Sequence, residues 1–583
     1  MVANLFSTGP GPSMSHRSHL FSLRPAHALR ESLSEGYDAR RLGRDLTAGL
    51  TVGLIAIPLS MALAIASGVA PQYGLYTAII GGFLIALLGG SRYSISGPTA
   101  AFVVILYPVA QNHGLTGLLL ATMMAGVLLV AMAVLRLGRL IEYIPPPVTL
   151  GFTAGIAVVI ATLQIKDFLG LPLEALPASF PAKLAALVTA LPALHPASLT
   201  VAVATLATLL IWPRLKTPLP PHLPAVLVGA LLALWFNHHG AQVPTIASRF
   251  HYVLDNGLSG QGIPPVLPEL AWPWARHGET LAWGALWEMA VSLVPTAFAI
   301  AMLGAIESLL CAVVLDGMTG RRHSANSELL GQGIGNMVVP LFGGITATAA
   351  LARSAANYKA GAQSPVAAMV HALVVLLAMV VLARWLGYLP MPAMAALLML
   401  VAWNMSEAPK ALKLVRRAPL SDVLVFLTCF GLTVLVDMVV AITVGVVLAA
   451  LLFVREIAAM TRVADITRSS RVSDYQPPAD WGVFKISGAL FFAAADRVFA
   501  ELAELAGERR VLVLYMDGVP VMDAGGLAAL EGFLARCEQA GTRVRIADLQ
   551  FQPLKTLARA GVLPREGAWS FHSTLDDALR APA

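Results

Sequence analysis

Charged residues are scarce in this sequence. The chain of 583 residues has 39 Lys and Arg and 33 Asp and Glu, 72 in all or 12%, whereas soluble proteins carry about 25%. The shortage is uneven, because residues 1–45 hold 10 of them, residues 46–460 hold 33, and residues 461–583 hold 29. The sequence therefore predicts a large membrane domain followed by one ordinary soluble domain.

Cysteine and the motifs of catalysis are also lacking. The three cysteines, Cys311, Cys429 and Cys537, form no CxxC pattern, which excludes a disulfide framework or a zinc site of that kind. No Walker lysine motif, nucleophile elbow or metal-spaced His/Cys cluster occurs. We therefore expect neither an enzyme nor a cofactor. The net charge of +6 is expected in loops at a membrane surface, with no nucleic-acid partner.

Apolar segments instead fill the middle of the chain, and about fourteen are expected to be membrane segments. Their approximate bounds are 46–66, 74–90, 98–112, 115–135, 147–168, 198–212, 222–238, 289–315, 327–341, 347–359, 366–386, 390–404, 420–437 and 438–456. Several are shorter than the roughly 20 residues that a plain helix needs to span a bilayer. Residues 1–45, which have no signal-peptide pattern, are expected to form a partly disordered arm.

The distribution of basic residues predicts the orientation. Basic loop residues fall at Arg136/Arg139, Arg321/Arg322, Lys410/Lys413/Arg416/Arg417 and Arg462/Arg468/Arg471. The stretch 238–288 has only two arginines and is rich in proline and tryptophan. The positive-inside rule places the basic loops in the cytoplasm and this stretch outside. An even number of spans then puts both termini in the cytoplasm.

Two interrupted segments stand at corresponding places in the two halves of the membrane domain. One covers Ser94–Ala101 and contains Gly97 and Pro98, and the other covers Gly343–Ala350. Each is a break followed by the start of a helix. Such matched breaks indicate a binding site near the middle of the membrane in a transporter built from inverted repeats.

Two helices that begin inside a membrane would direct unpaired N–H groups and positive dipole ends at one place, which suits an anion. Ser96 is expected to cap the first helix, and Pro98 suits its first turn. Thr346 and Thr348 could offer hydroxyl groups at the second helix. The alternative is that both breaks are ordinary kinks or turns.

Two charged residues in apolar surroundings are further candidates. Arg353 lies about one to two turns into the second helix, and its planar guanidinium suits a carboxylate or sulfate. Glu307 is the one carboxylate in the apolar run 291–315, where its protonation could be linked to transport. The alternatives are that Arg353 reaches an interface or pairs with a structural carboxylate, and that Glu307 bonds to a neighbouring helix.

After about residue 478 the pattern changes to alternating strands and helices. Strands are expected at 481–487, 511–516 and 543–549, and helices at 493–506, 523–537 and 551–560. This indicates a small α/β domain of about 100 residues.

Several motifs resemble those of the SulP anion permease family. They are Gly68–Tyr76, Ser96-Gly97-Pro98-Thr99, Ala305–Leu310 and Ala352-Arg353-Ser354. The last domain resembles the family's STAS domain, although Asp523-Ala524-Gly525-Gly526 lacks the serine that phosphorylated relatives carry. The resemblance implies a polytopic α-helical fold of about 14 segments in 7+7 inverted repeats with two half-helices, core and gate subdomains, alternating access and a homodimer.

The resemblance also implies roles for residues. The substrate site would comprise Ser96, Gly97, Thr99, Ala100, Thr346, Ala352, Arg353 and Ser354. Glu307 would hold the coupling ion. Some stretches are similar to members that carry C4-dicarboxylates, which implies import of succinate, fumarate or aspartate with protons across a bacterial inner membrane. Sulfate or bicarbonate transport with Na⁺ or H⁺, and an anion channel or sensor, remain alternatives.

The expected organisation has four parts. They are an N-terminal cytoplasmic arm at 1–43, a transmembrane domain at 44–460, a linker at 461–477 and a STAS domain at 478–583. The expected partners are the anion, the proton, the lipid bilayer, a second copy of the chain and, at the STAS domain, a soluble cytoplasmic protein.

Overall fold

The computed structural model describes residues 23–138, 144–173, 176–177, 179–215, 217, 219–253, 259–276, 282–436, 438–473, 475 and 477–582. Residues 1–22 of the expected arm and Arg139 of the basic loops lie outside them. The chain divides into two compact units, Met1–Gly445 and Val446–Ala583.

The first unit is helical. Its first half contains α2 (His27–Ser34), α3 (Ala39–Ala66), α4 (Pro71–Tyr76), a π-helical turn η1 (Thr77–Gly81), α5 (Gly82–Leu88), α6 (Ala100–Val134), α7 (Pro146–Leu169), α8 (Phe180–Ala190), α9 (Pro196–Ile211), α10 (His222–His238) and α11 (Ile246–Arg249). Its second half contains α12 (Trp283–Thr319), α13 (Ala325–Val338), α14 (Leu351–Lys359), α15 (Val366–Leu386), α16 (Met391–Ser406), α17 (Ala408–Arg417) and α18 (Leu420–Leu435). Helix α19 (Met438–Met460) continues into the second unit.

Among the described residues, nine helices are long and apolar enough to cross a membrane, and shorter apolar helices accompany them. The expected segments 98–112 and 115–135 correspond to two helical stretches of α6, which non-helical backbone at Gly114 separates. The backbone there has φ 62°, a conformation that glycine adopts without strain. Helices α2, α8, α11 and α17 and a short hairpin of β2 (His251–Val253) and β3 (Ser259–Gln261) were not expected from the sequence.

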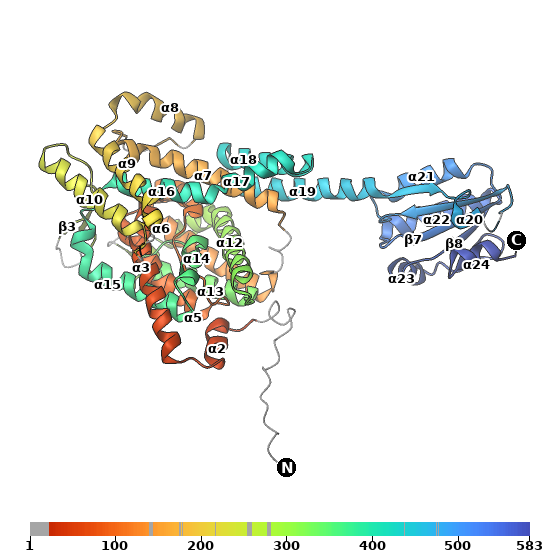
Figure 1. Ribbon diagram of the computed structural model, residues 1–583, viewed down its shortest axis with the longest axis horizontal. Helices are drawn as coiled ribbons and strands as arrows, with labels where there is room; N and C mark the ends of the chain where they lie inside the picture. The colour runs from red at the N-terminus through yellow and green to blue at the C-terminus, as the bar shows by residue number, and fades with distance from the viewer. Residues whose placement is uncertain are drawn as a thin grey trace, which may run out of the picture. The chain divides into compact units, whose positions relative to one another are not determined.

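The helices of the first unit pack as two bodies. In one, α13 and α12 pack on α6, while α15 and α14 pack on α3. In the other, α7 packs on α16 and α18, and α9 packs on α10 and α16. Each body takes helices from both halves of the sequence, as Figure 1 shows for α3 and α5 beside α13 and α14. This interleaving brings the two interrupted segments into the same body.

The second unit contains a five-stranded sheet in the order β5-β6-β7-β8-β9. The strands are β5 (Arg462–Asp465), β6 (Trp481–Ser487), β7 (Val511–Gly518), β8 (Arg543–Ala547) and β9 (Trp569–His572). The pair β5–β6 is antiparallel and the other pairs are parallel. Strand β5 lies in the stretch that the sequence indicated as a linker.

Consecutive apolar residues along the strands point to opposite faces of this sheet and bury both of them. Phe484, Leu512 and Leu514 pack against the helices α21 (Ala495–Ala506), α22 (Ala524–Gln539) and α23 (Phe551–Ala560). Val483 and Val513, on the other face, pack against α24 (Leu575–Arg580). The strands and helices predicted from the sequence are therefore confirmed in type and order, and Figure 1 shows them in blue.

Candidate functional site

The two interrupted segments lie side by side. Each forms a two-residue strand, β1 (Ser96–Gly97) and β4 (Thr348–Ala349), and the two pair antiparallel. Ser96 lies opposite Ala349, and Gly97 lies opposite Thr348. Two parts of the chain about 250 residues apart thus meet at one buried place.

A helix begins directly after each strand. Thr99 precedes the first turn of α6, and Ala350 precedes that of α14. Neither residue caps its helix with a side chain, so the first N–H groups of both helices, including those of Ala100 and Ala352, have no intrahelical acceptor. The expectation that Ser96 caps the first helix was wrong, because Ser96 lies three residues before Thr99. Pro98 likewise precedes the helix instead of standing in its first turn.

Arg353 joins the two breaks. It is the third residue of α14, nearer the helix start than the sequence suggested, and it is 2% exposed. One guanidinium nitrogen, Nη2, donates to the carbonyl oxygen of Pro98 at 2.6 Å. The other two, Nε and Nη1, have no hydrogen-bond partner in the structure. Leaving a buried charged donor unpaired is costly, so these two nitrogens are candidate donors to a ligand.

Gly97 leaves the space that this guanidinium occupies. A Cβ atom added to Gly97 would lie 2.9 Å from Nη1 of Arg353, which is closer than such atoms approach. A side chain at position 97 would therefore force the guanidinium of Arg353 to shift.

Glu307 is half-buried on α12 and contacts the first break. The hydroxyl group of Thr99 donates to its Oε2 at 2.9 Å. Thr99 is itself 6% exposed, so its hydroxyl group is committed to this carboxylate. Protonation of Glu307 would remove the negative charge of a hydrogen-bond acceptor directly beside the start of α6.

The remaining hydroxyl groups of the candidate site bond to protein groups. Thr346 pairs with Thr122 at 2.8 Å between their oxygens. The hydroxyl oxygen of Ser354 accepts from the N–H of Ile95 at 2.9 Å. In this structure these hydroxyl groups hold the breaks together instead of facing an open site.

A polar stripe on α13, which the sequence reasoning missed, fastens both breaks. Gln332 Nε2 lies 3.1 Å from both Ser96 Oγ and Glu328 Oε1, and Asn336 exchanges hydrogen bonds with the backbone of Ala347. Glu328 is 1% exposed, and its Oε2 accepts from the N–H groups of Gly90 and Ser91. The signal was present in the sequence, because Glu328, Gln332 and Asn336 are spaced four residues apart and so share one helix face.

This arrangement is that of a membrane transporter in which two helices start at one buried site. The model of the sulfate permease family matches residues 42–429, and that of the STAS domain matches residues 473–578. The chain belongs to the sulfate permease family. It therefore has about fourteen membrane segments in two inverted repeats of seven, followed by a STAS domain.

Named relatives agree with this assignment. The chain is 38% identical over 544 residues to "Putative sulfate transporter YvdB" of Bacillus subtilis, which covers 93% of this chain and 98% of the relative. It is 28% identical to "Bicarbonate transporter BicA" of Picosynechococcus, and this match covers 90% of this chain and 92% of the relative. The fold also matches the structure of the murine solute carrier 26 family member A9 anion transporter in the inward-facing state. The TM-score is 0.81 at 19% identity, and the match covers 98% of this chain and 96% of that chain.

Proposed function

We propose that this protein is a secondary active transporter that imports a small anion together with protons by alternating access. The observation that carries the proposal is the pair of unpartnered guanidinium nitrogens of Arg353. They lie where the helices α6 and α14 begin, so a charge and two helix dipoles favour an anion at the same place. The backbone N–H groups after Thr99 and Ala350 would complete the anion site.

Glu307 is proposed to hold the coupling proton. Its carboxylate contacts Thr99, so its protonation changes the charge and the hydrogen bonding beside the anion site. A neutral Glu307 would favour a bound anion, because a negative carboxylate repels it. The anion and the proton would therefore bind together and be released together.

The proposed cargo is a C4-dicarboxylate such as succinate, fumarate or aspartate, since a planar guanidinium can bind one carboxylate with two parallel hydrogen bonds. Sulfate or bicarbonate is the second candidate. It is favoured by the names of the two relatives, a putative sulfate transporter and a bicarbonate transporter.

The surroundings of the transporter are proposed on the distribution of charge. The basic residues of α17 and the Arg321/Arg322 loop favour a cytoplasmic position for their end of the helices. Both termini and the STAS domain would then be cytoplasmic, in the inner membrane of a bacterium. A homodimer and a soluble partner at the STAS domain complete the proposal.

The experiment is uptake into proteoliposomes that contain the purified full chain. Labelled succinate, sulfate and bicarbonate would each be offered with an inward proton gradient, an inward sodium gradient or neither. Proton-driven accumulation of succinate is expected. Accumulation of sulfate or bicarbonate would replace the cargo, sodium-driven uptake would replace the coupling ion, and flux that no gradient drives would indicate a channel.

A further inference from the structure

Helix α17 (Ala408–Arg417) has two chemically different sides, and none of its residues is buried. At 3.6 residues per turn, its basic residues share about one third of the circumference. They are Lys410, Lys413, Arg416 and Arg417. The apolar residues lie on the opposite side, where the side chains of Leu412 and Val415 are 49% and 42% exposed. The helix is therefore amphipathic, and its apolar side is only partly covered by protein.

The neighbours of α17 in the chain place it at a membrane surface. Only Glu407 separates it from α16, and only Ala418 and Pro419 separate it from α18. Both neighbours are apolar helices of the membrane domain, and the exposed Trp403 stands near the end of α16, where an interface anchor is expected. Because basic side chains are costly inside hydrocarbon, α17 lies at the interface where these two helices end.

Three of the four basic side chains on α17 are not engaged by a carboxylate. Lys410 pairs with Glu407. Among the residues that the structure describes, Lys413, Arg416 and Arg417 form no ion pair, and all three are exposed. Their charges are therefore available to an anionic group outside the protein.

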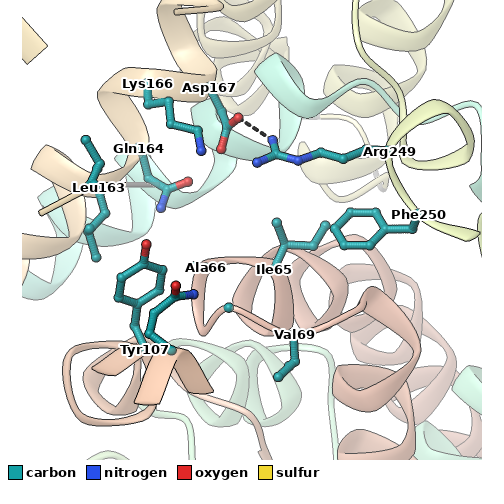
Figure 2. A pocket seen from close by; sticks show the side chains of 13 residues that line it. Ile65, Ala66, Val69, Tyr107, Leu163, Gln164, Lys166, Asp167, Arg249 and Phe250 are labelled. Atoms are coloured by element: carbon teal, nitrogen blue, oxygen red, sulfur yellow. Dashed lines mark hydrogen bonds and ion pairs between the residues drawn. The ribbon is translucent and has the colours of Figure 1, made fainter. Parts of the chain in front are cut away.

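Other charges near the helix reduce its positive charge without cancelling it. The first turn of α18 contains Asp422, so the segment 407–422 has four basic residues and two carboxylates, which leaves a net charge of +2. Figure 2 shows the contrasting case of Arg249, which lines a cavity of the transport domain and pairs with Asp167. That guanidinium is neutralised within the protein, whereas the basic side of α17 is not.

We propose that α17 is a binding site for an anionic phospholipid. Lys413, Arg416 and Arg417 would hold the phosphate of the headgroup, and Leu412 and Val415 would contact the acyl chains. An amphipathic helix with a basic side binds such a surface through both its apolar area and its charge. An uncharged phospholipid would lack the electrostatic attraction, and a free phosphate would lack the apolar contact.

The site itself requires only the membrane domain that the family defines. Its side of the membrane rests on the orientation proposed above, in which α17 meets the cytoplasmic leaflet, where anionic lipids create a negative surface potential.

The experiment is a titration of the purified full chain, in an uncharged detergent, with phosphatidylglycerol or phosphatidylcholine. Native mass spectrometry counts the bound lipids. Combining Lys413→Gln, Arg416→Gln and Arg417→Gln is expected to weaken the tightest binding of phosphatidylglycerol about 10-fold, because each basic residue near an anionic headgroup contributes to the attraction. The affinity for phosphatidylcholine is expected to stay the same.

Three further variants define the site. Combining Arg543→Gln, Lys555→Gln and Arg559→Gln removes the same charge from exposed positions of the second unit and is expected to change neither affinity. Exchanging lysine and arginine at the three positions of α17 keeps the charge and is expected to preserve binding. Combining Leu412→Ser and Val415→Ser is expected to weaken the binding of both lipids.

The outcomes that would overturn the proposal are distinct. Equal affinity for phosphatidylglycerol in the wild type and the glutamine variant of α17 would remove the basic side from lipid binding. An equal loss in the variant of the second unit would show a general effect of net charge. A charge-keeping variant that binds as weakly as the glutamine variant would show altered structure. Displacement of the lipid by inorganic phosphate at the same concentration would show a phosphate site that does not recognise lipid.

Discussion

The two repeats of the transport domain contribute the same backbone to the site but different side chains. Strand β1 leads into α6, and strand β4 leads into α14, with the same short antiparallel contact between them. The first repeat supplies Gly97, Pro98 and Thr99, none of which is charged. The second repeat supplies Arg353 and, on α12, Glu307.

This difference separates two tasks. The repeated backbone places two helix N-termini at one point, which attracts any small anion. The charged side chains come from one repeat, so on the proposed function residues of α12 and α14 would select the cargo and the coupling ion. The first repeat contributes space and a hydrogen bond to these charged side chains, since Gly97 makes room for Arg353 and Thr99 donates to Glu307.

Helix α13 connects the two contributions. Gln332 contacts Ser96 in the first break, and Asn336 contacts Ala347 in the second. Both side chains are buried. The spacing between the breaks is therefore fixed by buried side chains of α13.

The largest expected effect comes from removing the charge of the second repeat. Arg353→Ala should lower anion uptake by up to about 100-fold, because a charged hydrogen-bond donor to the anion contributes up to about 3 kcal/mol. Arg353→Lys should restore part of this uptake, since lysine keeps the charge but loses the planar fork. Uptake in proteoliposomes measures both. Near-normal kinetics in Arg353→Ala, with the protein correctly inserted, would remove the residue from the site.

The second effect concerns coupling. Glutamine at position 307 cannot bind or release a proton. In Glu307→Gln we therefore expect downhill exchange of the anion to continue, while the ratio of internal to external anion falls to the value reached without a proton gradient. Glu288→Gln is the matched control, because Glu288 lies on the same helix but is exposed. The ratio of internal to external anion under an inward proton gradient is the measurement. Normal accumulation in Glu307→Gln would assign coupling to another group.

The third effect tests the fit between the repeats. Gly97→Ala places a methyl group 2.9 Å from Nη1 of Arg353, so the guanidinium must move and the KM should rise about 10-fold. Gly317→Ala, a glycine on α12 with nothing within 4 Å of an added Cβ, should leave transport unchanged. Equal kinetics in the two variants would mean that the first repeat tolerates a side chain at Gly97.

The sequence predicted the backbone of the site because its signals are local. Glycine and proline interrupt apolar segments at two matched places, and Arg353 and Glu307 stand out as charges in apolar surroundings. Strands β6 to β8 were predictable for a related reason, since each is a short run rich in apolar residues. Strands β5 and β9, with four residues each, are too short to show a period.

The hydrogen-bond partners of the polar side chains could not be predicted from such local signals. Ser96 was expected to cap a helix, but Gln332, 236 residues away, donates to it. Thr346 was expected to face the anion, but it pairs with Thr122, 224 residues away. A hydroxyl group can cap a helix, bind a ligand or bond to a distant helix, and only the tertiary packing decides among these uses.

The smallest expected effect lies outside the membrane segments, where one carboxylate joins the two repeats. Glu35 lies 2.6 Å from Arg92 of the first repeat and 2.6 Å from Arg321 of the second. Its hydrogen bond with Arg92 lowers its pKa from 4.5 to about 2, against the opposing effect of burial. A carboxyl group with a lowered pKa in the folded state stabilises the fold above pH 4.5 and loses this contribution as the pH falls toward 2.

Glu35→Gln should therefore cost up to about 1 kcal/mol of stability at neutral pH, because these ion pairs are partly exposed. Thermal unfolding of both proteins from pH 7 to pH 3 measures the difference, which should shrink with acidity. A difference that stays constant over this range would show that the charge of Glu35 is not what joins the repeats there.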